Sequence, residues 1–322
     1  MLITGVAGFI GYHLAKRLLE EGYDLIGLDN LNNYYDPQLK KDRLAQLINY
    51  PNFEFIKIDF TDQEKTRSFF MKQSFEQVIH LGAQAGVGYS LENPQAYIDT
   101  NLTGFLNILE GCRHNNISRV IYASSSSVYG NNSKSPFSEN DQVRQPISLY
   151  GVSKLANEAM AHTYAHLYGM QMIGLRFFTV YGPWGRPDMA LFLFTKYILN
   201  RKPIQVFNQG KHTRSFTYIG DIIESIFQLI IIEKDTIKFQ KNEIFNIGGS
   251  EPVKLMRFIK IIENTLGLEA NIEYLPLQPG DVKKTNSDNQ KLESIIDYSP
   301  QIDIKTGIKH FIEWYKEYYN IS

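Results

Sequence analysis

The chain has 322 residues, of which 43% are hydrophobic and 21% are charged, and its formal net charge is −1. This near-neutral balance gives no electrostatic signature of binding to nucleic acid or to an anionic membrane surface, so we expect neither partner. The charged runs at 39–43 and 281–284 are interpreted as solvated faces. The single cysteine, Cys112, excludes a disulfide framework and a multi-cysteine metal site, so we expect a packed thiol, no bound metal and a cytoplasmic location.

The first half of the chain alternates strand-like and helix-like segments. Apolar runs with polar boundaries predict strands at 1–4, 24–30, 53–60, 77–84 and 119–126. A longer pattern predicts a helix over 148–169. Because strands that alternate with helices form right-handed crossovers, we expect a parallel, doubly wound α/β sheet. No apolar run reaches the ~18–20 residues of a membrane-spanning helix, and because the sequence starts with a strand-like segment we expect no signal peptide.

The character of the sequence changes after a further predicted strand at 172–183. Proline, glycine and aromatic residues become frequent, and a helix-like segment over 304–319 follows near the end. We expect a doubly wound domain over residues 1–175 and a smaller α+β lobe over 176–322, some of whose elements return to the sheet. A ligand would lie in the cleft at the carboxyl ends of the strands.

Three glycines after the first strand indicate a dinucleotide site. Their spacing gives a tight turn, bare backbone beside a pyrophosphate, and a helix whose amino end faces the phosphates. Asp29, at the end of the second strand, would accept hydrogen bonds from the adenosine ribose, which favours NAD over NADP. The residues of the predicted turn are Gly5, Gly8, Phe9, Ile10 and Gly11.

Later strand ends extend this predicted NAD site. Asn30 follows Asp29, and Asp59 ends the third strand, where a carboxylate would meet the adenine amino group. Phe60 would border the adenine ring. Small residues after the fourth strand allow a close approach of the cofactor, in the stretch Leu81, Gly82 and Ala83.

The catalytic prediction rests on serines and on a tyrosine–lysine pair. Serines occupy positions 124–127 at a strand end, and a buried hydroxyl without a partner costs roughly 1–3 kcal/mol, so they need water or a chemical role. Tyr150 and Lys154 lie four residues apart and share one helix face. The lysine ammonium favours the phenolate of a side chain that ordinarily titrates near about 10, which makes Tyr150 a candidate general base.

Together these features resemble an extended short-chain dehydrogenase/reductase of the NAD-dependent epimerase/dehydratase family, over essentially the whole chain. The stretches LDNLNNYYDPQLK, AQAGVGYSLENPQAY, SSSSVYG, RFFTVYGPWGRPDMA and QPGDV narrow the resemblance to UDP-glucuronate 4-epimerases. This resemblance implies a Rossmann-type sheet, a UDP-sugar-binding second lobe, NAD as cofactor, and a homodimer joined through the helices at 100–115 and 150–168.

The resemblance also implies a mechanism. Tyr150 would remove the proton of the sugar 4-hydroxyl while hydride moves from C4 to NAD+, and the resulting 4-keto sugar would turn over and be reduced on its other face. Ser125 matches the catalytic serine or threonine, Ser127 is a second hydroxyl against the sugar, and Ser126 is a predicted substrate contact. Related 4,6-dehydratases carry Asp-Glu where this chain has Ser126 and Ser127, which argues against dehydration.

Predicted substrate contacts lie mainly in the second lobe. Arg186 offers a fork for a carboxylate, and the hydroxyl of Thr179 stands where galactose-type epimerases tend to carry asparagine. By the same resemblance, Arg214 would neutralise the diphosphate, and Asp281 would bond a ribose hydroxyl or orient Arg214. The segment predicted to hold the uracil, 203–207, includes Gln205 and Phe207.

Gly88 is a departure, since the family usually reads AGVRYS where this chain reads AGVGYS. A 4-keto uronate is a β-keto acid that readily loses CO2, so we hypothesise that Gly88, a predicted substrate contact, makes the enzyme slower or leakier toward a UDP-pentose. The expected activity is conversion of UDP-glucuronate to UDP-galacturonate for surface polysaccharide. Three alternatives stay open: 4-epimerisation of a neutral or N-acetylated UDP-hexose, decarboxylation to UDP-xylose, and a catalytically silent NAD-binding regulator.

Overall fold

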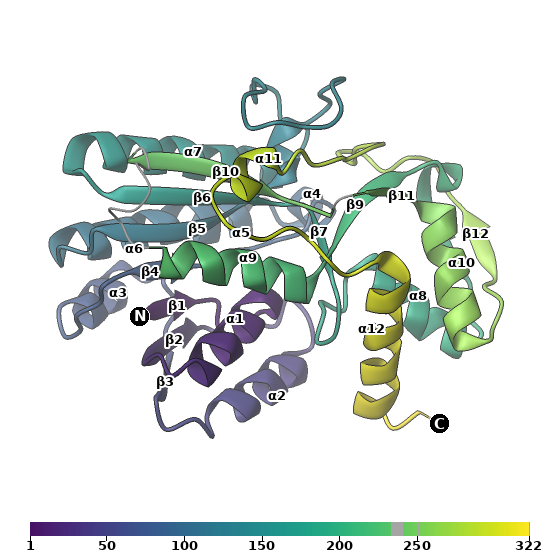
Figure 1. The fold of residues 1–322 in the computed structure, drawn as a ribbon, viewed down its shortest axis with the longest axis horizontal. Coiled ribbons are helices and arrows are strands. Elements are labelled where there is room, and N and C mark those ends of the chain that lie inside the picture. The colour runs from purple at the N-terminus through teal and green to yellow at the C-terminus, as the bar shows by residue number, and fades with distance from the viewer. Residues whose placement is uncertain (233–240, 250, 322) are drawn as a thin grey trace.

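A computed structural model describes residues 1–232, 241–249 and 251–321 of the chain. A central parallel sheet is covered by helices on both faces, and a lobe with two small sheets stands at one end of it (Figure 1). The Rossmann-type doubly wound fold predicted from the alternating pattern is thereby confirmed. Within the described residues, no helix combines the length and apolar character needed to cross a bilayer.

Seven parallel strands form the central sheet in the order β10-β6-β5-β4-β1-β2-β3. The strand order reverses at β1, which pairs with both β2 and β4, and ligands of such sheets bind outside the strand ends at this point. The strands are β1 (Leu2–Thr4), β2 (Leu25–Asp29), β3 (Phe53–Lys57), β4 (Val78–His80), β5 (Arg119–Ser125), β6 (Gln171–Phe177) and β10 (Asn242–Ile247).

Two groups of helices cover the sheet (Figure 1). One face carries α1 (Phe9–Glu20), α2 (Pro37–Leu47) and α9 (Ile219–Ile231). The other face carries α3 (Gln63–Phe70), α6 (Phe105–His114) and α7 (Leu149–Tyr168). The shorter elements of this part are α4 (Tyr89–Glu92), α5 (Gln95–Tyr97), a π-helix at Ile98–Gly104 and a 3-10 helix at Ser126–Tyr129.

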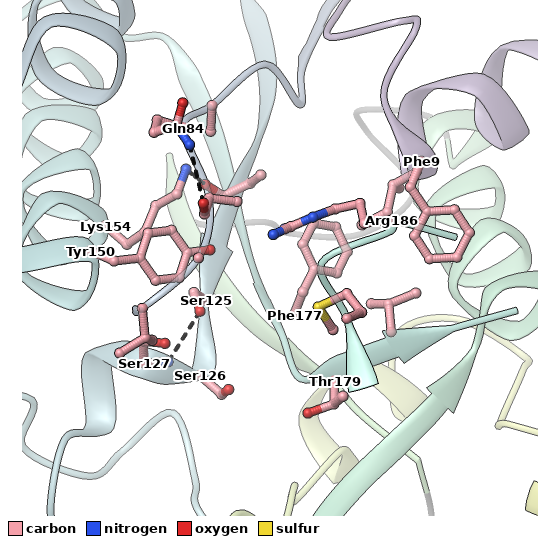
Figure 2. Close-up of a pocket in the computed structure, with 18 of the residues that line it drawn as sticks. Phe9, Gln84, Ser125, Ser126, Ser127, Tyr150, Lys154, Phe177, Thr179 and Arg186 are labelled. Carbon is pink, nitrogen blue, oxygen red and sulfur yellow. Dashed lines mark hydrogen bonds between the residues drawn. The ribbon is translucent and has the colours of Figure 1, made fainter. Parts of the chain in front are cut away.

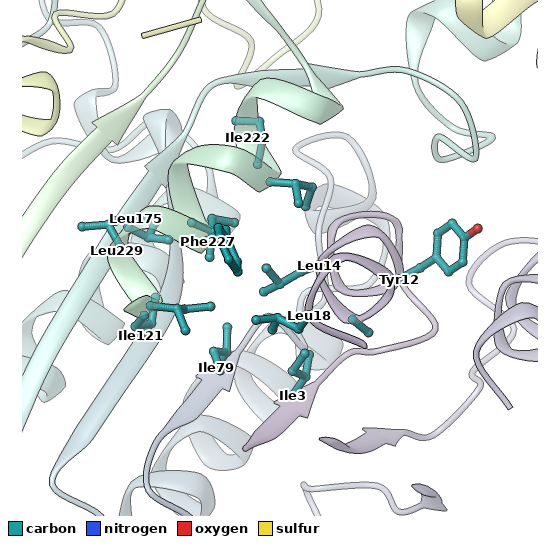
Figure 3. Packing of buried hydrophobic residues seen from close by; sticks show 14 of the residues in the cluster. Ile3, Tyr12, Leu14, Leu18, Ile79, Ile121, Leu175, Ile222, Phe227 and Leu229 are labelled. Carbon is teal, nitrogen blue, oxygen red and sulfur yellow. The ribbon is translucent and has the colours of Figure 1, made fainter. Parts of the chain in front are cut away.

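The main core joins the sheet to α1 and α9. Figure 3 shows the strand residues facing the two helices, and each fully buried side chain of this kind contributes about 1.5–3 kcal/mol. The core holds the carboxyl ends of β1, β4 and β5 in fixed positions. Cys112 lies fully buried in the core on the opposite face, as predicted. The residues labelled in Figure 3 are Ile3, Tyr12, Leu14, Leu18, Ile79, Ile121, Leu175, Ile222, Phe227 and Leu229.

The second lobe carries two small sheets. Its three-stranded sheet has the order β11-β9-β7, and its two-stranded sheet pairs β12 with β8. The strands are β7 (Thr179–Tyr181), β8 (Ile204–Val206), β9 (Thr213–Tyr218), β11 (Pro252–Lys254) and β12 (Ile272–Tyr274). The helices after residue 176 that lie outside the main core are α8 (Ala190–Leu199), α10 (Leu255–Leu266) and α12 (Ile304–Tyr318), with a 3-10 turn at Phe207–Gly210, whereas Leu292 of α11 (Gln290–Glu293) belongs to the main core.

Two sequence predictions are wrong in detail. The single strand predicted over 172–183 is interrupted at Phe178, so that β6 belongs to the central sheet and β7 to the second lobe. The charged run 39–43 is not a solvated face, because Lys40 is 5% exposed and Arg43 is 0% exposed. The division of the chain at residue 175 stays a prediction. Two elements after that residue belong with the central sheet: β10 is one of its strands, and α9 packs against it.

Candidate active site

One cleft of about 530 Å³ runs along the carboxyl ends of the central strands and continues against the second lobe. Every predicted site residue lies in its wall except Asp59 and Gly88. The wall therefore includes Gly5, Gly8, Phe9, Ile10, Gly11, Asp29, Asn30, Phe60, Leu81, Gly82, Ala83, Ser125, Ser126, Ser127, Tyr150, Lys154, Thr179, Arg186, Gln205, Phe207, Arg214 and Asp281.

The turn between β1 and α1 lies hard against neighbouring backbone. Gly5 has a φ of 71°, in the left-handed region, and a Cβ on it would lie 2.7 Å from the Cα of Gly82. A Cβ on Gly11 would lie 2.2 Å from the carbonyl oxygen of Gly5. The first turn of α1 has no side-chain cap and no acidic residue, so its amide groups are available to an anion such as a pyrophosphate.

Asp29 is buried where β2 ends. Its Oδ2 accepts a hydrogen bond from the Ala7 amide at 3.2 Å, and its Oδ1 accepts one from the Leu31 amide at 2.8 Å. Burial raises the pKa of Asp29, while the positive charge of Lys40 opposes the rise. A carboxylate fixed in this way can accept ribose hydroxyls and disfavours a 2′-phosphate, so the glycine turn and Asp29 together fit NAD.

Asp59 and Phe60, the two residues predicted to lie beside the adenine, have different positions relative to the cleft. Asp59 lies outside the wall and accepts a hydrogen bond from Asn30 Nδ2 at 3.0 Å, whereas Asn30 and Phe60 both line the cleft. Asp59 thus reaches the cleft through Asn30, and its direct contact with the adenine stays a prediction.

Tyr150 and Ser125 lie on one wall of the cleft (Figure 2). α7 begins just before Tyr150 because Ser148 Oγ accepts a hydrogen bond from the Gly151 amide at 3.1 Å. Desolvation raises the pKa of Tyr150, whereas hydrogen bonding with Ser125 and the positive charge of Arg186 lower it. The wall therefore holds a phenol whose ionisation is opposed by burial and favoured by two neighbours.

Lys154 lies one helical turn after Tyr150. It is 2% exposed, and its Nζ donates a hydrogen bond to the Ala123 carbonyl at 2.9 Å. Burial lowers the pKa of Lys154 to about 7, and the charge of Glu158 opposes this shift. The lysine can therefore gain or lose its charge near neutral pH.

Arg186 faces this pair from the other wall. Figure 2 shows its guanidinium extending into the cavity toward Tyr150, with Thr179 on the same side. Its Nε donates to Asp188 Oδ1 at 3.0 Å, and the Tyr34 hydroxyl donates to Asp188 Oδ2 at 3.0 Å. Burial alone would lower the pKa of Arg186, but the charge of Asp188 raises it above the ordinary value, so Arg186 stays cationic. Such a fork suits a ligand carboxylate.

A second cationic group lies farther along the cleft. Arg214 Nη2 donates to Asp281 Oδ1 at 2.8 Å, and His212 Nε2 lies 3.2 Å from Asp281 Oδ2. Burial lowers the pKa of Arg214, and Asp281 opposes the shift. Asp281 thus has the geometry to orient Arg214, one of the two roles considered for it. Gln205 and Phe207, on and after β8, line the same end.

Gly88 does not reach the wall. It is exposed, it precedes α4, and a Cβ built on it would meet nothing within 4 Å, although Gly86 and Val87 beside it line the cleft. Its effect on the substrate stays a prediction.

Several wall residues, and Asp188 beside the wall, were missed by sequence reasoning. Asp188 follows Arg186 by two residues, and a carboxylate so close to a predicted anion-binding arginine is a signal that could have been used. The wall residues had no local pattern to distinguish them; they include Tyr34, Lys40, Gln84 and His212. No group of three or more His, Cys, Asp or Glu side chains suited to a metal ion occurs in the described part of the chain.

Known proteins are similar to this chain over nearly its whole length. The model of the NAD dependent epimerase/dehydratase family matches residues 1–248. Protein CapI of Staphylococcus aureus is 49% identical over 99% of both chains. UDP-glucuronate 4-epimerase 4 of Arabidopsis thaliana is 44% identical over 99% of this chain and 76% of its own. The structure of UDP-glucuronic acid 4-epimerase from Bacillus cereus with UDP-glucuronic acid and NAD is 34% identical, with a TM-score of 0.92 and 99% of each chain covered. The chain belongs to the NAD dependent epimerase/dehydratase family.

Proposed function

We propose that this chain is an NAD+-dependent 4-epimerase that interconverts UDP-glucuronate and UDP-galacturonate through a 4-keto intermediate. The observation that carries the proposal is the arrangement across the cleft, with the phenol of Tyr150 on one wall and the guanidinium of Arg186 extending toward it from the other. A uronate whose 4-hydroxyl meets Tyr150 can present its neighbouring carboxylate to Arg186. The Bacillus cereus structure with UDP-glucuronic acid and NAD supports this assignment.

The chain's own residues move the proton. Tyr150 removes it from the 4-hydroxyl, and the hydrogen bond with Ser125 makes the phenolate easier to form by lowering the pKa. Protonated Lys154 adds a positive charge on the same helix face. NAD held by the glycine turn and Asp29 would supply the hydride acceptor and donor for C4 of the sugar, so that no net oxidation of the sugar would result. Tyr150 then returns its proton to the 4-oxygen.

The serines at the end of β5 argue against a competing elimination. Loss of water across C5 and C6 needs an acid and a base beside the sugar. Ser126 and Ser127, which line the cleft next to Ser125, are hydroxyls that do not ionise near neutral pH. They can donate hydrogen bonds to the sugar and its carboxylate, but they do not supply the acid and base that elimination of water would need.

Incubation with UDP-glucuronate and with UDP-glucose, followed by chromatography of the products, tests the proposal. We expect UDP-galacturonate from the native protein, and a loss of about 10²–10⁴ in rate for Tyr150→Phe, the range ascribed to one general acid–base group. Arg186→Ala should slow a uronate far more than a neutral sugar. A Tyr150→Phe protein that binds the dinucleotide and interconverts the sugars at full speed would overturn the proposal.

The same experiment separates the alternatives. Preferential turnover of UDP-glucose or its N-acetylated analogue would make the chain a 4-epimerase of neutral hexoses. A UDP-pentose as the main product would make it a decarboxylase. A protein that holds NAD yet is inert toward every UDP-sugar would be a non-catalytic regulator.

We also expect a cytoplasmic homodimer that serves polysaccharide synthesis. Apolar side chains stand exposed on the two helices named for pairing, with Leu106 of α6 41% exposed and Val152 of α7 44% exposed. Pairing of two chains through these helices would remove both side chains from water. Light scattering of the purified protein, and of a Leu106→Asp variant, tests the dimer.

A further inference from the structure

A fully buried arginine on α2 has no part in the steps above. Arg43 is 0% exposed, and its guanidinium donates four hydrogen bonds to uncharged oxygens. Nη1 donates to the Ala7 carbonyl at 2.9 Å and to the Tyr35 hydroxyl at 2.8 Å. Nη2 donates to the carbonyls of Trp184 at 2.5 Å and Gly185 at 3.2 Å. Burying a cation is costly, so a guanidinium in this position needs all of these acceptors.

The acceptors belong to the two halves of the active site. Ala7 lies within the glycine turn that fits the cofactor, and its amide donates to Asp29. Trp184 and Gly185 directly precede Arg186. Trp184 has a φ of 59°, in the left-handed region that a bulky side chain avoids, so the backbone of this loop is held in an unfavourable conformation by its surroundings.

The segment between β2 and α2 approaches the same loop a second time. The Tyr35 hydroxyl accepts from Arg43, while the adjacent Tyr34 hydroxyl donates to Asp188, which pairs with Arg186. Tyr35 is therefore linked through Arg43 to Trp184, which precedes Arg186, and Tyr34 is linked directly to Asp188, which follows it. The loop that carries Arg186 is thus fixed to the first domain on both sides.

We infer that Arg43 is a positioning residue, which holds the loop bearing Arg186 at a set distance from the turn that binds the cofactor. The inference rests on the proposed function, in which Arg186 engages the substrate carboxylate. A planar fork can satisfy several carbonyls at once, whereas a lysine at this position supplies a point charge without that geometry. A displacement of about 1 Å at a reacting group costs up to about 10²-fold in rate.

The test compares Arg43→Lys with Arg119→Lys in the NAD-loaded protein. Arg119 is a matched control, because it is also buried and donates to three carbonyls, those of Leu229, Ile230 and Ile232, away from the cleft wall. Calorimetry measures the Kd of UDP-glucuronate and of UDP. We expect Arg43→Lys to raise the Kd of UDP-glucuronate at least about tenfold more than the Kd of UDP. Arg119→Lys should change the two Kd values by the same factor.

A double substitution separates positioning from general damage. In an Arg186→Ala background, Arg43→Lys should change the ratio of the two Kd values by less than about twofold, because the group it positions is gone. An unchanged ratio in the single Arg43→Lys variant, or an equal change in both backgrounds, overturns the inference. If Arg43→Lys does not fold, Tyr35→Phe, which removes one acceptor, must shift the ratio in the same direction or the inference fails. If Arg186→Ala alone leaves the ratio unchanged, the proposed function is at fault instead.

Discussion

Replacing Arg176 by methionine should destabilise the protein strongly, because it leaves a buried carboxylate without its cation. Arg176, on β6, donates from Nε and Nη2 to the two carboxylate oxygens of Glu158, each at 2.8 Å. The side chains are 3% and 5% exposed. Glu158 lies one turn after Lys154 and also accepts from Ser124 Oγ at 2.6 Å, so the pair is part of the support behind Lys154.

The magnitude follows from this burial. Removing one partner of a buried ion pair costs about 3–5 kcal/mol. In a domain of 150–250 residues, 1 kcal/mol shifts Tm by about 2–4 °C, so a Tm lower by roughly 6–20 °C is expected. The control is Arg17→Met. Arg17 pairs with Glu21 and Glu224, but its side chain is 34% exposed, and such pairs contribute about 0–1 kcal/mol.

Urea unfolding monitored by circular dichroism measures both variants. A second substitution, Glu158→Leu in the Arg176→Met background, should recover part of the lost stability, because replacing both members of a buried pair by apolar residues is often neutral. The reasoning is refuted if the free energies of unfolding of Arg176→Met and Arg17→Met differ by less than about 1 kcal/mol. It is also refuted if the double variant is less stable than Arg176→Met alone.

Three further substitutions test the site. Ser125→Ala removes a hydrogen bond that lowers the pKa of Tyr150, so the acidic limb of the kcat profile should move to higher pH; an unmoved limb contradicts this. Asp29→Ala should release NAD during gel filtration, seen as lost dinucleotide absorbance, and equal retention would remove Asp29 from the site. Gly88→Arg should leave stability within about 0.5 kcal/mol because its Cβ direction is open, and should reduce UDP-pentose by mass spectrometry; equal pentose from both proteins rejects the leak hypothesis.

The parts of the site that were predictable are those whose function leaves a local pattern. A glycine turn between a strand and a helix has a fixed spacing, a carboxylate at the next strand end has a fixed place, and a tyrosine and lysine four residues apart must share a helix face. In the structure, all of these residues line the same cleft. The family resemblance added Arg186 and Thr179, which no spacing argument could have related to Tyr150.

The prediction for 172–183 was wrong for a tertiary reason. The stretch is apolar throughout, and periodicity cannot show that a buried strand changes sheets. Phe178 makes the break: its amide donates to the Ile247 carbonyl at 3.0 Å and its ring packs in a cluster with Val128, Tyr129 and Phe137. Thr179 then starts a strand of the second lobe and lines the cleft.

The error over 39–43 has a more general cause. In a helix as rich in charge as α2, arginine and lysine are ordinarily solvated, so the sequence alone favours an exposed face. The carbonyls that accept from buried Arg43 lie up to 142 residues away in the sequence, and the Tyr34–Asp188 hydrogen bond joins residues that are 154 positions apart. Motifs therefore specify the reacting groups, while the distances between motifs depend on residues that carry no motif. Two chains with the same glycine turn, tyrosine and arginine can then differ in how a carboxylate meets the base, and residues such as Arg43 are where that difference should be sought.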